Sequence, residues 1–168
     1  MVAPEGTPAR SERSQVELAA GVGTRARVAD SGRPVLLATL AVPFDPAAAA
    51  FAVDAAVEAG QPLVVVNVVD LPPLGMSVAM RYDQLPEAPE EADALRAPAE
   101  LAFSLGVRVE RLRVKSPRPV AALLELVAER RPGLLVFGPD RRRMRGRLYR
   151  KAVRAVRKGA GCLVWLPD

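Results

Sequence analysis

Two apolar runs of strand length, separated by an alanine-rich stretch, set the fold class of this chain. The runs are 35–42 and 63–69, and both are almost free of polar side chains, as expected for strands covered on both faces. Between them, Asp45 and Pro46 predict a helix start, as an N-cap and a first-turn proline, and Gly60 predicts its end. A strand, a helix and a strand within about 35 residues indicate a right-handed βαβ unit, which implies a parallel sheet and the α/β class.

The rest of the chain continues this alternation. A proline-rich crossing segment, 70–86, leads to a helix over 89–106 and then to a half-polar strand, 107–114, of the kind found near a sheet edge. The remaining elements are a helix over 120–131, a strand over 134–137, a helix over 142–158 and a strand over 162–166. We therefore predict an open five-stranded parallel sheet with helices on both faces.

Length, cysteine content and the N-terminal sequence narrow the kind of protein. At 168 residues and 50% apolar composition, the chain can fill one core of ordinary size. Residues 1–32 mix proline, glycine, serine and charged side chains, which predicts a flexible tail ahead of one domain over 33–168. The tail lacks an apolar signal segment, no run approaches the ~18 apolar residues of a membrane span, and the lone Cys162 suits a reducing compartment. We expect a cytoplasmic protein with no membrane partner.

The side chains that the sequence lacks exclude most kinds of catalysis. There is no histidine, which removes the commonest general base, the usual hydrolase triad and imidazole metal ligands. Cys162 lies in an apolar run, where a buried and unreactive thiol is expected. Asp70, at a strand end, has no visible partner for acid–base chemistry. We predict that the chain is not an enzyme and holds no metal.

The most uneven feature of the sequence is a basic tract. Residues 141–158 carry ten of the 24 basic side chains and no acidic one, so with a net charge of +5 everything outside the tract sums to −5. The tract follows the strand 134–137, and the loop after such a strand is a common phosphate site. Guanidinium groups bind phosphate by charge-assisted, bidentate hydrogen bonds. The candidate contacts to an anionic small molecule are Gly138, Arg141, Arg142, Arg143, Arg145 and Arg147.

Spacing within the predicted helix 142–158 separates an apolar stripe from a cationic one. The stripe expected to be buried comprises Met144, Leu148, Ala152, Val153, Ala155 and Val156. The opposite stripe comprises Arg147, Arg150, Lys151, Arg154, Arg157 and Lys158. Two interpretations of this stripe stay open. It is either a solvated surface or a contact for anions, including the backbone of DNA or RNA, for which Tyr149 alone offers an aromatic neighbour.

Three segments resemble the universal stress protein family. They are Val-Asn-Val-Val-Asp at 66–70, Leu-Leu-Val-Phe-Gly at 134–138, and 153–164 with its Gly-Ala-Gly-Cys-Leu-Val ending, and the similarity extends over 33–168. The resemblance implies a Rossmann-like sheet with strand order 3-2-1-4-5. It also implies a homodimer formed by pairing of the fifth strands, Cys162 to Leu166, and a fifth strand at a sheet edge needs such pairing or other protection.

Nucleotide-binding members of this family carry an aspartate that closes the first strand and a Gly-x-x-Gly-x9-Gly-Ser/Thr signature. Of that signature this chain keeps Gly138 alone: Arg141, Lys151 and Ala152 stand at the other positions, and Leu40 stands near that of the aspartate. A main-chain phosphate nest needs N–H groups and residues that tolerate positive φ, which proline and arginine do not supply. The sequence therefore predicts no cofactor at the family's usual ATP site.

These observations give one leading functional hypothesis and two alternatives. The leading hypothesis is a regulatory or stress-response binding protein, homodimeric, that takes an anionic ligand without the usual ATP site. The first alternative is an ATP-binding family member whose phosphate site is rebuilt from arginines. The second is a weakly specific nucleic-acid-associated protein, whose binding would be sensitive to salt.

Overall fold

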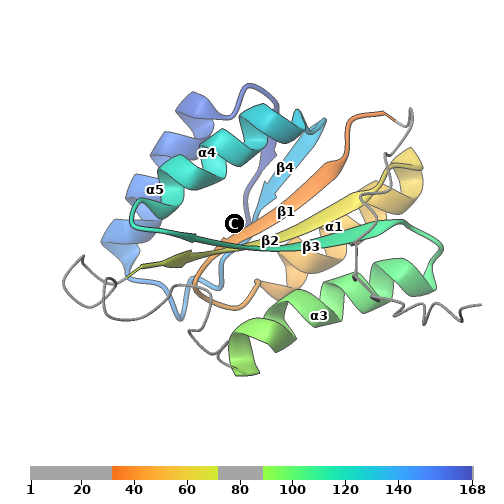
Figure 1. Ribbon diagram of the computed structural model, residues 1–168, viewed down its shortest axis with the longest axis horizontal. Helices are drawn as coiled ribbons and strands as arrows, with labels where there is room; N and C mark the ends of the chain where they lie inside the picture. Colours follow the sequence, from red (N-terminus) through yellow and green to blue (C-terminus); the bar gives the residue numbers. More distant parts are fainter. Residues whose placement is uncertain (1–31, 72–88, 168) are drawn as a thin grey trace, which may run out of the picture.

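Helices cover both faces of a parallel sheet in the computed structural model, which describes residues 32–71 and 89–167 (Figure 1). The strands are β1 (Val35–Leu40), β2 (Leu63–Asp70), β3 (Val109–Ser116), β4 (Leu134–Phe137) and β5 (Leu163–Trp165). The helices are α1 (Pro46–Ala59), α3 (Pro89–Ser104), α4 (Pro119–Arg130) and α5 (Gly146–Gly159). The order across the sheet is β3-β2-β1-β4-β5, which confirms the predicted class and topology. The tail predicted over 1–32 lies, apart from Gly32, outside the described residues.

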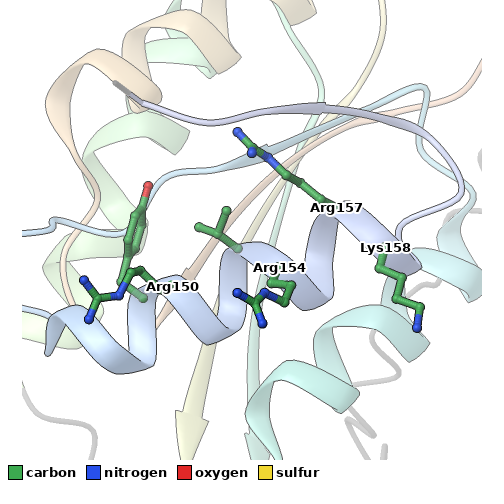
Figure 2. Close-up of a pocket in the computed structure, with 6 residues that line it drawn as sticks. Arg150, Arg154, Arg157 and Lys158 are labelled. Carbon is green, nitrogen blue, oxygen red and sulfur yellow. The ribbon is translucent and has the colours of Figure 1, made fainter.

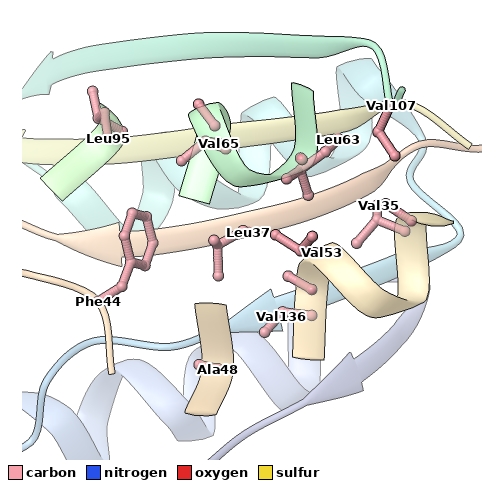
Figure 3. Close-up of a cluster of buried hydrophobic side chains, with 14 residues drawn as sticks. Val35, Leu37, Phe44, Ala48, Val53, Leu63, Val65, Leu95, Val107 and Val136 are labelled. Atoms are coloured by element: carbon pink, nitrogen blue, oxygen red, sulfur yellow. The ribbon is translucent and has the colours of Figure 1, made fainter. Parts of the chain in front are cut away.

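The central strands are buried on both faces, which explains their unbroken apolar sequences. Because side chains alternate along a strand, Leu37 and Val65 face α1 and α3 (Figure 3), whereas Leu36 and Val66 face α4 and α5. All four side chains are fully buried. At about 1.5–3 kcal/mol for each buried aliphatic side chain, these two cores supply most of the drive for folding. Within the described ranges, no helix is long and apolar enough to cross a membrane.

Helix α1 begins and ends where the sequence indicates. The Asp45 carboxylate accepts hydrogen bonds from the N–H groups of Ala47 (2.9 Å) and Ala48 (3.2 Å). At the other end, Gly60 takes the left-handed conformation, with φ 61° and ψ 28°, and so stops the helix. These two caps fix the path by which the chain leaves β1 and returns to β2.

The predicted start of the last helix is wrong, because α5 begins at Gly146 and not at Arg142. The Asp140 carboxylate accepts the N–H of Arg142 (2.9 Å), and the Asp140 carbonyl accepts the N–H of Arg143 (3.1 Å). An aspartate side chain that bonds to nearby main chain in this way competes with helix formation. Residues 141–143 therefore form a turn ahead of the helix.

One residue of the apolar stripe predicted for this helix is not buried. Leu148 is 46% exposed, whereas Ala152 and Val156 are fully buried. In the first turn the core position belongs to Tyr149, whose ring stacks on that of Phe137 with 6.5 Å between centroids.

The chain leaves β1 through a strained residue. Ala41 has a φ of 52°, in the left-handed region where a Cβ costs roughly 1–2 kcal/mol. Its N–H donates to the side-chain oxygen of Asn67 (3.0 Å), and the hydroxyl of Thr39 donates to the carbonyl of Val42 (2.8 Å). Asn67 and Thr39 are both buried, so two polar core residues hold this turn in place.

We expect Ala41→Gly to raise the free energy of unfolding by up to about 1 kcal/mol, because glycine adopts this φ without a clash. The same substitution at Ala50, which is exposed in the middle of α1, should lower it by about 1 kcal/mol, since glycine disfavours a helix. Urea unfolding followed by circular dichroism measures both changes. Equal losses of stability in the two variants would contradict backbone strain at Ala41.

Candidate anion-binding site

The carboxyl ends of β1 and β4 meet where the strand order reverses, which in an open α/β sheet is the usual place for a ligand. Here the two loops that follow these strands hydrogen-bond to each other. The N–H of Asp45 donates to the carbonyl of Gly138 (2.9 Å), and the N–H of Asp140 donates to the carbonyl of Pro43 (2.8 Å). The residues between these pairs form an isolated antiparallel bridge. The main chains of the two loops are thus joined to each other at this end of the sheet.

Gly138 is a packing residue at this junction. It is buried, and its N–H donates to the carbonyl of Ala38 (3.0 Å). A Cβ at this position would overlap the Cβ of Ala48 in α1. The absence of a side chain therefore lets the first turn of α1 pack directly on the end of β4.

Most main-chain donors of the loop after β4 are already used inside the protein. The N–H groups of Gly138 and Asp140 bond to the β1 side of the junction, and those of Arg142 and Arg143 bond to Asp140. Pro139 has no N–H. The Asp140 carboxylate thus occupies part of the concave main chain that could otherwise receive a phosphate oxygen. An anion that binds at this loop must be held chiefly by side chains.

Arginine side chains surround the start of α5. The N-terminal residue before the helix is Arg145, whose side chain makes no capping hydrogen bond, and the first turn contains no acidic residue. Arg142, Arg145 and Arg147 are exposed and make no ion pair within the part of the chain that the structure describes. Because the N-terminus of a helix carries a partial positive charge, cations there are unfavourable unless an anion joins them.

Arg141 is oriented differently from its neighbours. Its guanidinium carbon lies 5.1 Å from the ring centroid of Tyr149, in a cation–π contact. The structure therefore brings the predicted arginines to one loop and one helix end, but turns Arg141 along α5. Gly138 is not exposed with the arginines: it is buried, and it allows α1 and β4 to pack closely at the junction.

The exposed side of α5 forms a second cationic surface, which belongs to the stripe that the sequence left open as either a solvated surface or a contact for anions. A hollow of about 490 Å³ lies against this helix (Figure 2). We call it the α5 groove; the described residues that line it are Tyr149, Arg150, Val153, Arg154, Arg157 and Lys158. The four-residue spacing of Arg150, Arg154 and Lys158 is the sequence signal that points to it.

Two observations on the described residues concern catalysis. In the described ranges, no cluster of three histidine, cysteine or carboxylate side chains is placed to hold a metal ion. Burial raises the pKa of the Cys162 thiol above its ordinary value, against the opposing effect of a hydrogen bond with the Leu135 main chain. A thiol with a raised pKa stays protonated at neutral pH and is a poor nucleophile.

The sequence matches the universal stress protein family over residues 32–166. The chain belongs to this family. Among solved structures, the universal stress protein from Archaeoglobus fulgidus is 18% identical, with a TM-score of 0.58, 82% of this chain and 100% of that chain being covered. UspA from Lactobacillus plantarum is 19% identical, with a TM-score of 0.57 and coverage of 83% and 100%. No curated protein matches the chain.

A second structure of the Archaeoglobus fulgidus universal stress protein holds dAMP; it is 18% identical, with a TM-score of 0.57 and coverage of 82% and 98%. At these identities the comparisons establish the fold. Two of the positions where this universal stress protein departs from the nucleotide-binding signature, 40 and 141, lie close in sequence to the junction, and the other two, 151 and 152, lie within α5. Leu40, near the place of the strand-one aspartate, is 5% exposed in the core, and Arg141, in place of a glycine, is turned onto Tyr149.

We expect Gly138→Ala to lower the free energy of unfolding by about 1–3 kcal/mol, because the new methyl group overlaps Ala48 in a close-packed core. Gly161→Ala is the matched control, since the space around Gly161 is open, and it should change stability little. Adding Ala48→Gly to the Gly138 variant should restore part of the loss. Chemical unfolding measures all three, and a Gly138→Ala variant as stable as the control would contradict close packing at the junction.

Proposed function

We propose that this universal stress protein is a regulatory binding protein that holds a phosphate-bearing anion through arginine side chains at the start of α5. The observation that supports this most directly is the state of the loop after β4. Most of its main-chain donors are committed inside the protein, while Arg142, Arg145 and Arg147 stand exposed around a helix end that has no side-chain cap. Guanidinium groups are then the donors available to a phosphate.

The proposal places the protein in the cytoplasm and gives it no catalytic role. The lone Cys162, half-buried and with a raised pKa, suits a reducing compartment and supplies no activated nucleophile. The candidate site gathers arginines and one carboxylate, Asp140, and that carboxylate is engaged in the turn. Groups of this kind bind and orient an anion, but they offer no general base near its phosphorus.

If guanidinium groups hold the ligand, the site should bind its phosphate groups and make no specific contact with the nucleoside. We expect pyrophosphate and ATP to bind with similar affinity in isothermal titration calorimetry, and adenosine to give no heat. The variant Arg142→Gln/Arg145→Gln/Arg147→Gln should bind pyrophosphate at least about tenfold more weakly, since each charge-assisted hydrogen bond contributes about 1.5–3 kcal/mol. The variant Arg111→Gln/Arg118→Gln/Arg131→Gln, with the same change in charge at exposed positions elsewhere, should bind normally.

Two outcomes would overturn this proposal. The absence of heat with both pyrophosphate and ATP would show that the loop binds no phosphate. ATP binding that is much tighter than pyrophosphate binding, and that survives the triple replacement at 142, 145 and 147, would show a nucleotide site of the main-chain kind.

We also propose that the protein is a homodimer joined through β5. A difference in charge between the two edge strands of the sheet supports this proposal. The β3 edge strand contains charged side chains, which discourage pairing with another chain, whereas Leu163, Val164 and Trp165 of β5 carry none. Leu163 is 74% exposed, and Trp165 stacks on Phe51 with 4.6 Å between centroids, which widens the apolar edge.

We expect Leu163→Lys to convert the dimer to a monomer in sedimentation equilibrium, because the lysine would have to be buried or repelled at the paired edge. Leu105→Lys is the matched control: Leu105 is 53% exposed after α3, far from β5 in the strand order, and its replacement should leave the dimer intact. A wild-type protein that sediments as a monomer at high micromolar concentration would refute the dimer.

A further inference from the structure

The α5 groove continues the cationic loop into one long track. Arg141, from the turn, lies over Tyr149, and Tyr149 is the first described residue of the groove. From there the track runs along α5, whose 14 residues span about 21 Å at 1.5 Å per residue. The loop and the groove therefore adjoin each other, with Arg141 between them.

The four cations of the α5 groove, Arg150, Arg154, Arg157 and Lys158, have no ion-pair partner among the described residues. Elsewhere the fold does pair its arginines: Arg130 contacts Glu110 through two hydrogen bonds of 2.8 and 2.9 Å. Because Arg154 has a like charge four residues away on each side, this face repels itself. An external polyanion would relieve that repulsion.

The shape of the groove favours an extended ligand over a small one. Every described residue that lines it belongs to the single helix α5 (Figure 2), so the described part of the chain forms one wall of the groove. Small-molecule sites bury most of their ligand's surface, which one helix face does not achieve. A polymer compensates by touching many cations in sequence. The net charge of −5 outside 141–158 repels such a polymer from the rest of the protein.

The apolar part of the groove does not offer a platform for base stacking. The ring of Tyr149 already stacks on Phe137 and contacts the guanidinium of Arg141. Val153 has no π-face. The contacts available are therefore charge contacts to phosphates, with apolar contact beneath, and such contacts carry no information about base sequence.

We propose that the track formed by Arg141 and the α5 groove binds the phosphodiester backbone of a nucleic acid without reading its sequence. The arginines of the loop remain the phosphate site of the proposed function, and Arg141 is the residue that joins it to the groove. The inference itself rests on Arg150, Arg154, Arg157 and Lys158, which the small-anion site does not use.

Fluorescence anisotropy with a labelled DNA duplex of about 12 base pairs, roughly 40 Å at 3.4 Å per pair, tests the proposal. We expect binding at about 50 mM salt whose affinity falls steeply by about 200 mM, and equal affinity for a duplex of scrambled sequence. In Arg150→Gln/Arg154→Gln/Arg157→Gln, the slope of log affinity against log salt should shrink by about 2.7, or 0.9 for each phosphate contact removed. The control Arg111→Gln/Arg118→Gln/Arg131→Gln removes the same charge and should keep the wild-type slope.

The single variant Arg154→Glu separates a loss of binding from a loss of folding. A glutamate between Arg150 and Lys158 turns two repulsive pairs into attractive ones, so the melting temperature should rise while duplex binding weakens at least about tenfold. The triple replacement at 142, 145 and 147 should lose pyrophosphate binding and still bind the duplex, so the two proposals fail separately.

Three results would overturn the inference. The first is no duplex binding at low salt. The second is an equal loss of binding in the groove variant and the control variant, which would make the effect one of net charge. The third is tighter binding to vesicles of anionic phospholipid than to the duplex, which would identify a membrane surface as the partner.

Discussion

The hydrogen bonds between the loops after β1 and β4 are the constraint on which the chemistry of this protein depends. They join Asp45 to Gly138 and Asp140 to Pro43 across the point where the strand order reverses. In this fold that point is where main-chain amides can meet a phosphate. Because most of the amides of the loop after β4 are bonded within the protein, the recognition of an anion that we propose falls mainly to side chains. The bonded main chain and the arginines at the start of α5 therefore belong together in this proposal. Where the loop amides are occupied, guanidinium groups are the donors that remain for an anion.

The arrangement of arginines lowers the stability of helix α5 through electrostatic repulsion. A helix with arginines at its N-terminus and like charges four residues apart loses a few tenths of a kcal/mol for each repulsive pair. Helix α5 contributes to one core the fully buried side chains of Ala152 and Val156 and the half-buried ones of Tyr149 and Val153. The strands and α1 carry the stability of the domain. The polyanion that we propose as the ligand would relieve this repulsion.

The sequence predicted the fold well because its signals are local and mutually consistent. Apolar runs, the Asp45 cap and Gly60 each indicate their own element, and the family resemblance implied the strand order that the structure confirms. The site was harder, because its features depend on contacts between distant residues. That Gly138 faces Ala48, or that the turn at Ala41 bonds to Asn67, depends on how α1 and β2 lie against neighbouring strands, which no local pattern contains. The early start predicted for the last helix is wrong for a local reason. The Asp140 carboxylate accepts the N–H of Arg142 and so competes with helix formation at that residue.

The two edges of the sheet differ in charge. The β3 edge contains charges in its strand, and the β5 edge contains none. Helix α5 connects β4 to β5, so the cationic track lies on the half of the sheet that ends in the uncharged edge. Replacements of the arginines and the lysine on the track leave both cores untouched, because these side chains are exposed, while replacements at the junction change the packing of α1 on β4. A loss of anion binding without a loss of stability therefore identifies the track, and a loss of both identifies the junction.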